Sequence, residues 1–561
     1  MVRIALCQAN LVVGDIDRNV QHIRTEIDRA CAQGAELIVF PELSVTGYPP
    51  EDLLLRSRFW EQAEAAVQQL ATDVHNAVVL VGYPHLSGSL FNSAAVLAGG
   101  QVQAIYRKCL LPNYSVFDEK RYFAGGDKGM VLHMNGVAVG ITICEDLWHP
   151  EGPGKQAVVD GTVQLIVNLS ASPYHRGKGF EREELFKTRC RDYNCFIAFC
   201  NAVGGQDELV FDGHSLIMSP DGEVLARGRQ FEEDLVIMDI EVDKRWTTPQ
   251  TTTDQVTYVT LSTRSTTKPI LDTPKRPTLL AQEAEVYRAL VLGTADYFAK
   301  NGFQKAVLGL SGGIDSAVAL VIAADALGPE AITAVSMPSR YTSDANRDDA
   351  SELAKRLGVN LLELPIHKLV NSYDETLATL FLNTASNVAE ENLQARIRGN
   401  LVMALSNKFS WLVLTTGNKS EMSVGYATLY GDMAGGFSVL KDVLKTWVYR
   451  IAEWYNRNHE IIPRRIIEKA PTAELRENQF DTDSLPPYTE LDTILTAYVE
   501  DNLTLAEIES LGFEEHLVRR IVGMVDGAEY KRRQAPPGVR ITKRAFGKDR
   551  RLPITNKFRV E

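Results

Sequence analysis

Short apolar runs alternate with amphipathic segments along the first 245 residues of the chain. The runs are rich in Val, Ile and Leu and end at polar or turn-forming residues, a pattern that predicts strands. Between them, apolar residues three or four positions apart predict helices at 19–33 and 59–74. The predicted strands lie at 3–8, 37–40, 77–82, 137–144, 165–169 and 196–201. Strands and helices that alternate in this way indicate a layered α/β domain.

The alternation stops near residue 246, where Thr, Ser, Pro and Gln become frequent. This composition is typical of a linker or an irregular arm. We therefore predict a first domain at 1–245, a linker arm at 246–278 and a second domain at 279–561.

The second domain begins with a predicted helix at 280–299. A strand at 306–310, a glycine-rich loop, a helix at 317–326 and a further strand that ends near Met337 follow in that order. This order is typical of a doubly wound parallel sheet.

The overall composition is that of an ordinary globular protein. The chain has 561 residues, of which 45% are hydrophobic and 23% are charged, so two to four domains are expected. No stretch approaches the roughly 18 consecutive apolar residues of a membrane-spanning helix, and the first residues already read as a strand. We therefore expect a soluble, cytoplasmic protein without a membrane partner.

The charge balance argues against a nucleic-acid partner. Lys and Arg number 59 and Asp and Glu number 72, a net charge of −13 that would repel phosphate backbones. The last 31 residues, 531–561, are the exception, with 11 Lys or Arg and 2 Asp or Glu. This basic tail is either a solvated extension or part of a site for a small phosphorylated ligand. Residues 503–525 resemble a helix-turn-helix, but Glu514 and Glu515 would face phosphate at the start of the second helix, which favours a plain helical hairpin.

All seven cysteines lie in the first 200 residues. Their odd number and the absence of a Cys-x-x-Cys pair favour reduced thiols over disulfides or a zinc site, and leave one of them free to act as a nucleophile. The ten histidines show no metal-ligand spacing.

One glycine-rich loop stands between a predicted strand and a predicted helix. Two adjacent glycines allow backbone N–H groups to approach a ligand, and the helix N-terminus adds a favourable potential for phosphate. It is neither a Walker A loop, since no Gly-Lys-Ser/Thr follows, nor a Rossmann Gly-x-Gly-x-x-Gly. The predicted phosphate-binding residues are Gly309, Leu310, Ser311, Gly312, Gly313, Ile314, Asp315 and Ser316.

The Ser-Gly-Gly-Ile-Asp-Ser sequence of this loop resembles the loop of the N-type ATP pyrophosphatases, which split ATP into AMP and pyrophosphate. Within that superfamily, five further segments resemble NAD synthetases; they lie at 392–399, 415–421, 425–432, 441–445 and 530–538. The resemblance implies that ATP meets Thr416 and Lys445, and that deamido-NAD⁺ meets Asn392, Arg396, Glu421 and Lys531.

ATP chemistry of this kind needs Mg²⁺, which prefers hard oxygen ligands. Asp315 and Glu421 are the candidate ligands, so Glu421 has two possible roles that the sequence leaves open. The chain also departs from the ammonia-using members of the family, because Leu429 and Gly436 stand where those proteins have a lysine and an aspartate. The Lys531 segment is expected to compensate in part.

Three chemically active residues each follow a predicted strand in the first domain: Glu42, Lys108 and Cys144. They can therefore meet at one end of a sheet. A free thiol is mostly neutral at neutral pH and needs a base or a cation to become a nucleophile. The chemistry assigns attack on an amide carbonyl to Cys144, proton transfer to Glu42 and stabilisation of the oxyanion to Lys108.

With their flanking residues, these three resemble the Glu-Lys-Cys triad of the nitrilase or carbon–nitrogen hydrolase superfamily, whose fold is a four-layer αββα sandwich. The resemblance spans residues 1–245. It implies that glutamine contacts Tyr114, Ser172 and Lys178, and that Glu119 orients Lys108.

Together the two resemblances imply an enzyme that releases ammonia from glutamine and consumes it in the ATP-dependent amidation of deamido-NAD⁺ to NAD⁺. AMP, pyrophosphate and glutamate are the other products, and the ammonia needs a shielded passage. We also expect a homo-oligomer. The alternatives are a glutamine-dependent ATP-pyrophosphatase amidotransferase with another carboxylate acceptor, and a nucleotide-binding regulatory protein with an inactive amidase domain.

Overall fold

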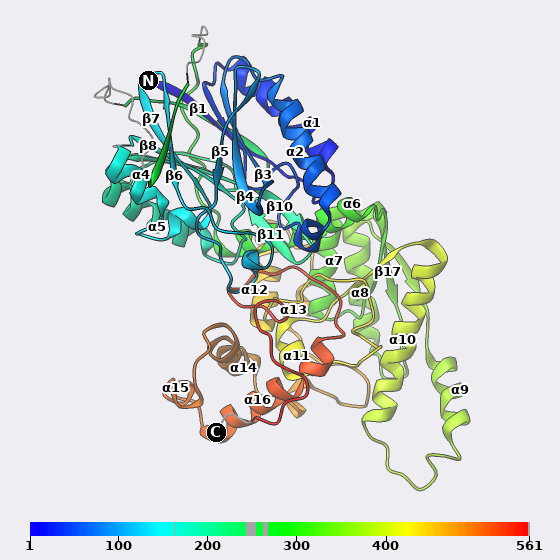
Figure 1. Ribbon diagram of the computed structural model, residues 1–561. Coiled ribbons are helices and arrows are strands. Elements are labelled where there is room, and N and C mark those ends of the chain that lie inside the picture. Colours follow the sequence, from blue (N-terminus) through cyan, green and yellow to red (C-terminus); the bar gives the residue numbers. More distant parts are fainter. Residues whose placement is uncertain (162, 243–253, 262–267, 559–561) are drawn as a thin grey trace. The chain divides into compact units, whose positions relative to one another are not determined.

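The computed structural model describes residues 1–161, 163–242, 254–261 and 268–558 (Figure 1). The chain forms two compact units. The first contains Met1–Gln206 and Val210–Leu280, and the second contains Asp207–Leu209 and Ala281–Glu561.

Two sheets form the centre of the first unit. The six-stranded sheet has the order β14 (Asp234–Ile240), β1 (Val2–Gln8), β2 (Leu37–Val39), β3 (Val78–Ser87), β4 (Ser89–Ala98) and β5 (Gln101–Arg107). The seven-stranded sheet has the order β13 (Val224–Arg227), β12 (Leu216–Met218), β9 (Phe196–Asn201), β8 (Leu165–Ser170), β7 (Val137–Ile143), β6 (Gly129–Met134) and β15 (Val256–Leu261). A separate two-stranded ladder joins β10 (Val203–Gln206) and β11 (Leu209–Asp212).

Helices cover the outer face of each sheet. The first sheet packs against α1 (Ile16–Ala32) and α2 (Ser57–Ala71), and the second against α4 (Pro153–Gly161) and α5 (Lys178–Tyr193). A third apolar cluster, which includes Leu6, Ile141 and Leu169, fills the space between the sheets. The inner strands are buried on both faces, which explains their nearly continuous apolar runs. The predicted αββα sandwich is therefore confirmed.

The predicted linker arm contains a strand. Val256–Leu261 forms β15, which pairs in parallel with β6, and residues 268–280 also belong to the first unit. Arg3 and Arg227 hold the arm, because they donate hydrogen bonds to the carbonyl oxygens of Pro269 and Pro277 at 2.8 and 2.7 Å. The Thr-rich residues 247–253 lie outside the described residues.

The second unit has a five-stranded parallel sheet, as the sequence predicts. Its order is β18 (Asn360–Glu363), β17 (Ile332–Ser336), β16 (Ala306–Gly309), β19 (Leu412–Thr415) and β20 (Phe437–Ser438). β17 and β18 lie on one side of β16, and β19 and β20 lie on the other, so the strand order reverses at β16. In open parallel sheets, ligands bind outside the carboxyl ends of the strands at such a switch point.

The helices of the second unit surround this sheet and continue beyond it. α10 (Val388–Phe409) packs Val402 on the sheet residues Val307, Val335 and Val413. The others are α6 (Gln282–Asn301), α7 (Ile314–Leu327), α8 (Asp344–Leu357), α9 (His367–Leu377), α11 (Lys419–Val424), α12 (Lys445–Tyr455), α13 (Arg464–Glu468), α14 (Tyr488–Leu495), α15 (Leu505–Glu509), α16 (Glu515–Gly527) and α17 (Glu529–Arg532). Short helical segments are α3 (Glu145–Trp148), η1 (Glu51–Leu55), η2 (Glu119–Arg121), η3 (Pro329–Ala331), η4 (Asp481–Asp483) and η5 (Thr496–Glu500).

No helix in the described part of the chain is both long and apolar enough to cross a membrane. The segment that resembles a helix-turn-helix forms α15 and α16, and α16 turns Val518, Ile521, Val522 and Val525 inward. This packing is that of the helical hairpin favoured from the sequence.

Candidate active sites

In the first unit, Lys108 lies between two carboxylates. Its Nζ is 2.6 Å from Oε1 of Glu42 and 2.8 Å from both carboxylate oxygens of Glu119. The side chains of Lys108 and Glu42 have no exposed surface. An ammonium group has three hydrogens to donate, so these two carboxylates occupy every donor of Lys108.

Burial and charge act against each other in this group. Burial lowers the pKa of Lys108, but Glu119 and Glu42 more than offset it, and the pKa stands well above the ordinary value for lysine. Burial raises the pKa of Glu119 to about 7, although Lys108 and the hydroxyl of Tyr48, which donates to Glu119 at 2.9 Å, lower it. Lys108 is therefore a fixed positive charge.

Glu42 is held by two further donors that the sequence analysis did not identify. The Asn92 side-chain amide donates to Oε1 at 2.7 Å, and the backbone N–H of Ala171 donates to Oε2 at 3.1 Å. Asn92 is fully buried on β4. A single asparagine in an apolar strand carries no signal in one sequence, so only the structure reveals this contact.

Cys144 follows β7 directly and has an unusual backbone conformation, with φ of 43° and ψ of −103°. Positive φ is uncommon for residues other than glycine and concentrates at functional sites. The side chain is only 3% exposed. Burial raises the pKa of its thiol well above the ordinary value, Glu42 raises it further and Lys108 lowers it. The resting sulfur is therefore a neutral thiol that needs a base.

The three predicted glutamine contacts lie in different environments. Ser172 is buried, and its backbone N–H donates to the Asn201 side chain at 2.9 Å. Tyr114 is 55% exposed and donates to Glu145 Oε2 at 3.0 Å. Lys178 begins α5, with its Nζ 4.1 Å from the centre of the Trp148 ring. Burial lowers the pKa of Lys178 to about 8. The charge on Cys144 affects the pKa values of both Tyr114 and Lys178, which indicates that they lie around the thiol.

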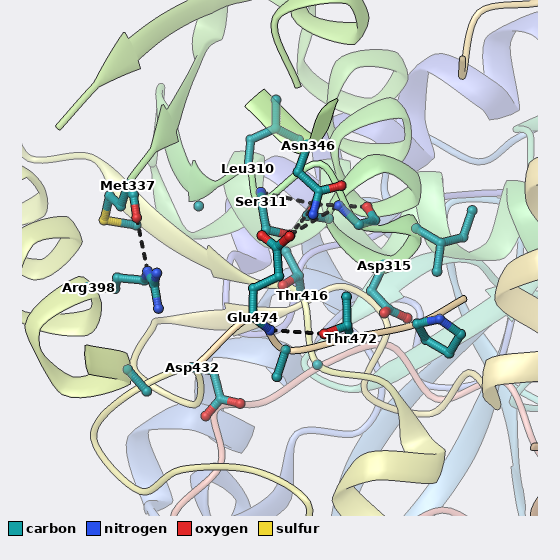
Figure 2. A pocket seen from close by; sticks show the side chains of 18 of the residues that line it. Leu310, Ser311, Asp315, Met337, Asn346, Arg398, Thr416, Asp432, Thr472 and Glu474 are labelled. Atoms are coloured by element: carbon teal, nitrogen blue, oxygen red, sulfur yellow. Dashed lines mark hydrogen bonds between the residues drawn. The ribbon is translucent and has the colours of Figure 1, made fainter. Parts of the chain in front are cut away.

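The second unit contains a cavity of about 310 Å³ at the switch point of its sheet. The loop residues Gly309, Leu310, Ser311, Gly313, Ile314, Asp315 and Ser316 line it, together with Thr416, Glu421 and Lys445. Figure 2 shows Ser311 and Asp315 at the cavity, with Thr416 beside them from the next strand. The structure therefore brings the predicted ATP residues, except Gly312, to the lining of one cavity.

The glycine-rich loop has the conformation that its glycines permit. Gly312 has φ of +79°, and a Cβ there would lie 2.3 Å from the backbone oxygen of Asn346. The Ser316 hydroxyl donates to the carbonyl of Gly313 at 2.9 Å, and Gly313 N–H donates to the Ser311 hydroxyl at 3.2 Å. The helix α7 starts at Ile314, three residues earlier than predicted, so its N-terminus follows the loop directly.

Lys445 lies between the two predicted metal ligands. Its Nζ is 2.5 Å from Asp315 Oδ2 and 3.2 Å from Glu421 Oε1. Burial, with help from Asp315, raises the pKa of Glu421 to about 8, although Lys445 lowers it. Burial lowers the pKa of Lys445, but the two carboxylates raise it well above the ordinary value. Two carboxylates that converge on one cation are a donor set that suits Mg²⁺.

The other residues assigned to deamido-NAD⁺ gather around the segment 425–429, beside the cavity. Asn392 accepts a hydrogen bond from the Thr428 hydroxyl at 2.7 Å, and Arg396 donates to the carbonyl of Leu429 at 3.2 Å. Lys531 donates to the carbonyls of Gly425 and Ala427 at 2.7 and 2.8 Å. None of these three side chains is among the residues that line the cavity. Lys531 thus supports the segment through backbone contacts.

The cavity also has lining residues that the sequence analysis missed. Figure 2 shows Arg398, which donates to the carbonyl of Met337 at 3.1 Å, and Glu474, which also lines the cavity. Glu474 accepts a hydrogen bond from the backbone of Ser343 at 3.3 Å. Arg398 lies two residues after the predicted Arg396, in the same segment, 392–399. The resemblance of that segment to NAD synthetases was therefore the sequence signal that could have identified Arg398.

Three arginines of the basic tail are internal. Arg532, Arg540 and Arg550 are each at most 7% exposed. They pair with Glu529, Asp549 and Asp526 at 2.9, 2.6 and 3.3 Å. This part of the tail is therefore a buried structural element, not a solvated extension.

Two family models match the chain in succession. The model described as carbon–nitrogen hydrolase matches residues 3–250, and the model described as NAD synthase matches residues 286–535. They correspond to the two units of the fold.

Relatives with both parts match the whole chain. The glutamine-dependent NAD(+) synthetase of Thermotoga maritima is 47% identical, and the match covers 100% of this chain and 99% of that protein. The glutamine-dependent NAD(+) synthetase of Aquifex aeolicus is 44% identical, and the match covers 100% of both proteins. The structure of the glutamine-dependent NAD⁺ synthetase from Acinetobacter baumannii with ADP is 41% identical, with a TM-score of 0.77 over 100% of this chain and 99% of that one. The enzyme from Cytophaga hutchinsonii, 22% identical over 99% of this chain and 98% of its own, has the same fold with a TM-score of 0.81. The chain therefore belongs to the family of glutamine-dependent NAD⁺ synthetases.

Proposed function

We propose that this chain makes NAD⁺ from deamido-NAD⁺, ATP and glutamine, with AMP, pyrophosphate and glutamate as the other products. The observation that carries the proposal is the presence of two complete reaction sites in one chain. The first unit has a buried thiol with a carboxylate and a lysine, and the second has a phosphate loop at a cavity. A regulatory protein would need neither the strained cysteine nor its supporting carboxylates.

In the first unit, Glu42 takes the proton of Cys144 and the sulfur attacks the amide carbon of glutamine. The amide nitrogen leaves as ammonia with that proton, and a thioester remains on Cys144 until water hydrolyses it. Lys108 stabilises the developing oxyanion by its charge, because Glu42 and Glu119 already hold its donors. Lys178 is suited to the α-carboxylate of glutamine.

In the second unit, the loop 309–316 would hold the phosphates of ATP through its backbone N–H groups and the start of α7. Asp315 and Glu421 would hold Mg²⁺, which supplies charge neutralisation for the phosphates when bound. Lys445 occupies the point between these carboxylates and must shift toward the phosphates when a cation enters. Thr416 lies at the end of the adjacent strand β19 and faces the same cavity.

Deamido-NAD⁺ would bind next to ATP, so that its nicotinate carboxylate attacks the α-phosphorus and ammonia then displaces AMP. Asn392, Arg396 and Lys531 would fix the segment 425–429 against this substrate. Glu421 lies between the predicted metal and dinucleotide positions, so a shared role is the simplest assignment. The ammonia would pass between the sites without exposure to solvent, where most of it would become protonated.

We also propose a cytoplasmic homo-oligomer. α9 buries none of its side chains, and its surroundings expose several large apolar residues. A helix without buried contacts is only marginally stable on its own, so we propose that a second copy of the chain packs against α9 and the exposed apolar side chains around it. The exposed apolar side chains are Leu369, Tyr373, Leu380, Phe381, Leu382 and Val388. Sedimentation of Leu380→Glu with Leu382→Glu against Leu511→Glu, an exposed leucine elsewhere, tests this surface.

The central experiment supplies the chain with glutamine, ATP and Mg²⁺, with and without deamido-NAD⁺, and measures NAD⁺, AMP and glutamate. NAD⁺ that appears only with deamido-NAD⁺ supports the proposal. Glutamate without NAD⁺ points to an amidotransferase with another carboxylate acceptor. The absence of all turnover points to a nucleotide-binding regulatory protein.

A further inference from the structure

The proposed nucleophile of the first unit, the sulfur of Cys144, lacks an obvious hydrogen-bond donor that would stabilise its negative charge. The N–H donors of Lys108 are all directed to Glu42 and Glu119. Glu42 itself disfavours an anion on the sulfur, since it raises the pKa of Cys144. A neutral hydrogen-bond donor beside the sulfur would stabilise the thiolate without adding another charge to the buried cluster.

Ser170 is in the right place to be this donor. β7 and β8 run parallel with Ile143 opposite Leu169, so Cys144 and Ser170 are the next residues along the two strands. The backbone N–H of Cys144 donates to the carbonyl of Leu169 at 2.8 Å, which ties the two strand ends together. Both side chains therefore belong to one buried corner of the seven-stranded sheet.

The hydroxyl of Ser170 is buried and has no hydrogen-bond partner among the residues that the structure describes. Leaving a buried polar group without a partner costs about 1–3 kcal/mol, so such groups need an explanation. By contrast, the hydroxyl of Thr142, on the neighbouring strand β7, donates to the carbonyl of Val167 at 3.0 Å. The thiol of Cys144 is a weak acceptor, whereas a thiolate is a strong one.

We propose that the Ser170 hydroxyl donates a hydrogen bond to the Cys144 sulfur once the thiol has lost its proton, and is thus a further catalytic residue. Ser170 keeps its own proton throughout, and the thiol proton goes to Glu42. The role deepens the proposed glutaminase reaction and rests on it. The hydrogen bond forms only when the sulfur is anionic, so it favours the reactive state over the resting one.

The electrostatic surroundings agree with this placement. Burial dominates the rise in the pKa of the Cys144 thiol, and the nearby Ser170 side chain is among the groups that lower that pKa. The charged or titratable groups that affect the thiol, or that its charge affects, are Glu42, Lys108, Glu145, Tyr48, Tyr114 and Lys178. The hydroxyls of Tyr48 and Tyr114 already donate to Glu119 and Glu145. Among these hydroxyls, that of Ser170 has no other acceptor in the described part of the chain.

The test measures the thiol itself. Iodoacetamide labels the full chain over a range of pH, and mass spectrometry follows the peptide that contains Cys144, with Cys144→Ala as the blank. Ser170→Ala should slow this labelling about 10- to 100-fold near neutral pH, the effect of removing one hydrogen bond to a charged group. Glutamine-dependent NAD⁺ formation should fall by a similar factor, while ammonium-dependent formation stays unchanged.

Ser93→Ala is the matched control. Ser93 is also fully buried in this unit, but its hydroxyl contacts the local carbonyl of Phe91 at 3.5 Å. Ser170→Thr keeps a hydroxyl and should label within about threefold of the natural chain, which separates loss of the donor from loss of packing.

Labelling of Ser170→Ala at the natural rate, or equal slowing in Ser93→Ala, would overturn the proposal. Slow labelling of a folded Ser170→Thr variant would also count against it. If instead the natural chain hydrolyses no glutamine, the proposed function fails, and that result is distinct because the labelling assay reads the sulfur directly.

Discussion

Each unit places a lysine between two carboxylates, but in different settings. Lys108 lies between Glu42 and Glu119 with no exposed side-chain surface. Lys445 lies between Asp315 and Glu421, whose side chains are each 18% exposed beside a cavity of about 310 Å³. In the closed arrangement, Lys108 keeps its positive charge from one reaction to the next. The open one holds together the two carboxylates that we propose as Mg²⁺ ligands, until ligands take the place of the lysine.

The two sites also differ in the groups that donate hydrogen bonds to the carboxylates beside each lysine. In the closed site, Asn92, Tyr48 and the backbone of Ala171 fill the remaining acceptor positions of the carboxylates. Buried charges are tolerated only when such partners are present. At the open site, Asn418 donates to Asp315 at 2.9 Å, and the cavity supplies room for ligand atoms. A rigid site suits covalent catalysis, and an open site suits large substrates.

The strongest test separates the two sites completely. Cys144→Ala should abolish glutamine-dependent NAD⁺ formation, a loss of at least about 10³-fold, because no other group can form the thioester. Ammonium salts should still support NAD⁺ formation, since the second unit keeps all its residues. Parallel assays with glutamine and ammonium measure this. Loss of both activities would show that the units do not act independently.

Removal of a carboxylate from the open site should affect both nitrogen sources. Asp315→Ala removes one candidate Mg²⁺ ligand and leaves Lys445 with one carboxylate, so NAD⁺ formation should fall about 10²- to 10³-fold with glutamine or ammonium. Release of AMP is the direct measurement. Undiminished AMP would remove Asp315 from its assigned role.

Replacing each lysine by arginine sharpens the comparison between a closed and an open site. A guanidinium group is larger and planar, and it does not fit a fully buried ammonium site. Lys108→Arg should lower glutamine hydrolysis about 100-fold. Lys445→Arg, beside the cavity, should lower ammonium-dependent synthesis about 10-fold. Equal losses in the two assays would contradict the distinction.

A smaller effect is expected from the pH dependence of glutamine binding. Burial lowers the pKa of Lys178 to about 8, so its positive charge is present below pH 8 and is lost as the pH rises through that value. The KM for glutamine should therefore rise about 3- to 10-fold above pH 8. Lys178→Arg keeps its charge, and its KM should remain flat over the same range. A KM of the natural chain that is insensitive to pH would remove this assignment.

Much of the fold could be predicted because apolar periodicity reports which residues face a core. The runs at 137–144 and 306–310 correspond to β7 and β16, since inner strands buried on both faces must be apolar throughout. The arm at 246–278 was harder to interpret. Its strand β15 lies at the edge of a sheet, where polar Thr and Tyr are tolerated, so the composition resembled a linker.

The candidate sites could be predicted in part. Glu42, Lys108 and Cys144 each come shortly after a strand, as predicted. However, β2 and β5 belong to the six-stranded sheet and β7 to the seven-stranded sheet, so the three residues come from both sheets and not from one end of a single sheet. Asn92 carries no motif and contributes through a side chain 50 positions away in sequence from Glu42. Lys531 donates hydrogen bonds to the backbone carbonyls of Gly425 and Ala427, and its contact with the substrate stays a prediction.

The sequence by itself determined the two-part organisation, the order of strands and helices, and the candidates for the phosphate loop and the nucleophile, because these depend on residue type and local spacing. Only the tertiary structure decided which side chains support them. Asn92 at Glu42, Lys445 between two carboxylates and the unpaired hydroxyl of Ser170 beside Cys144 arise from contacts between distant segments. Such contacts depend on strand register and burial, which one sequence does not record.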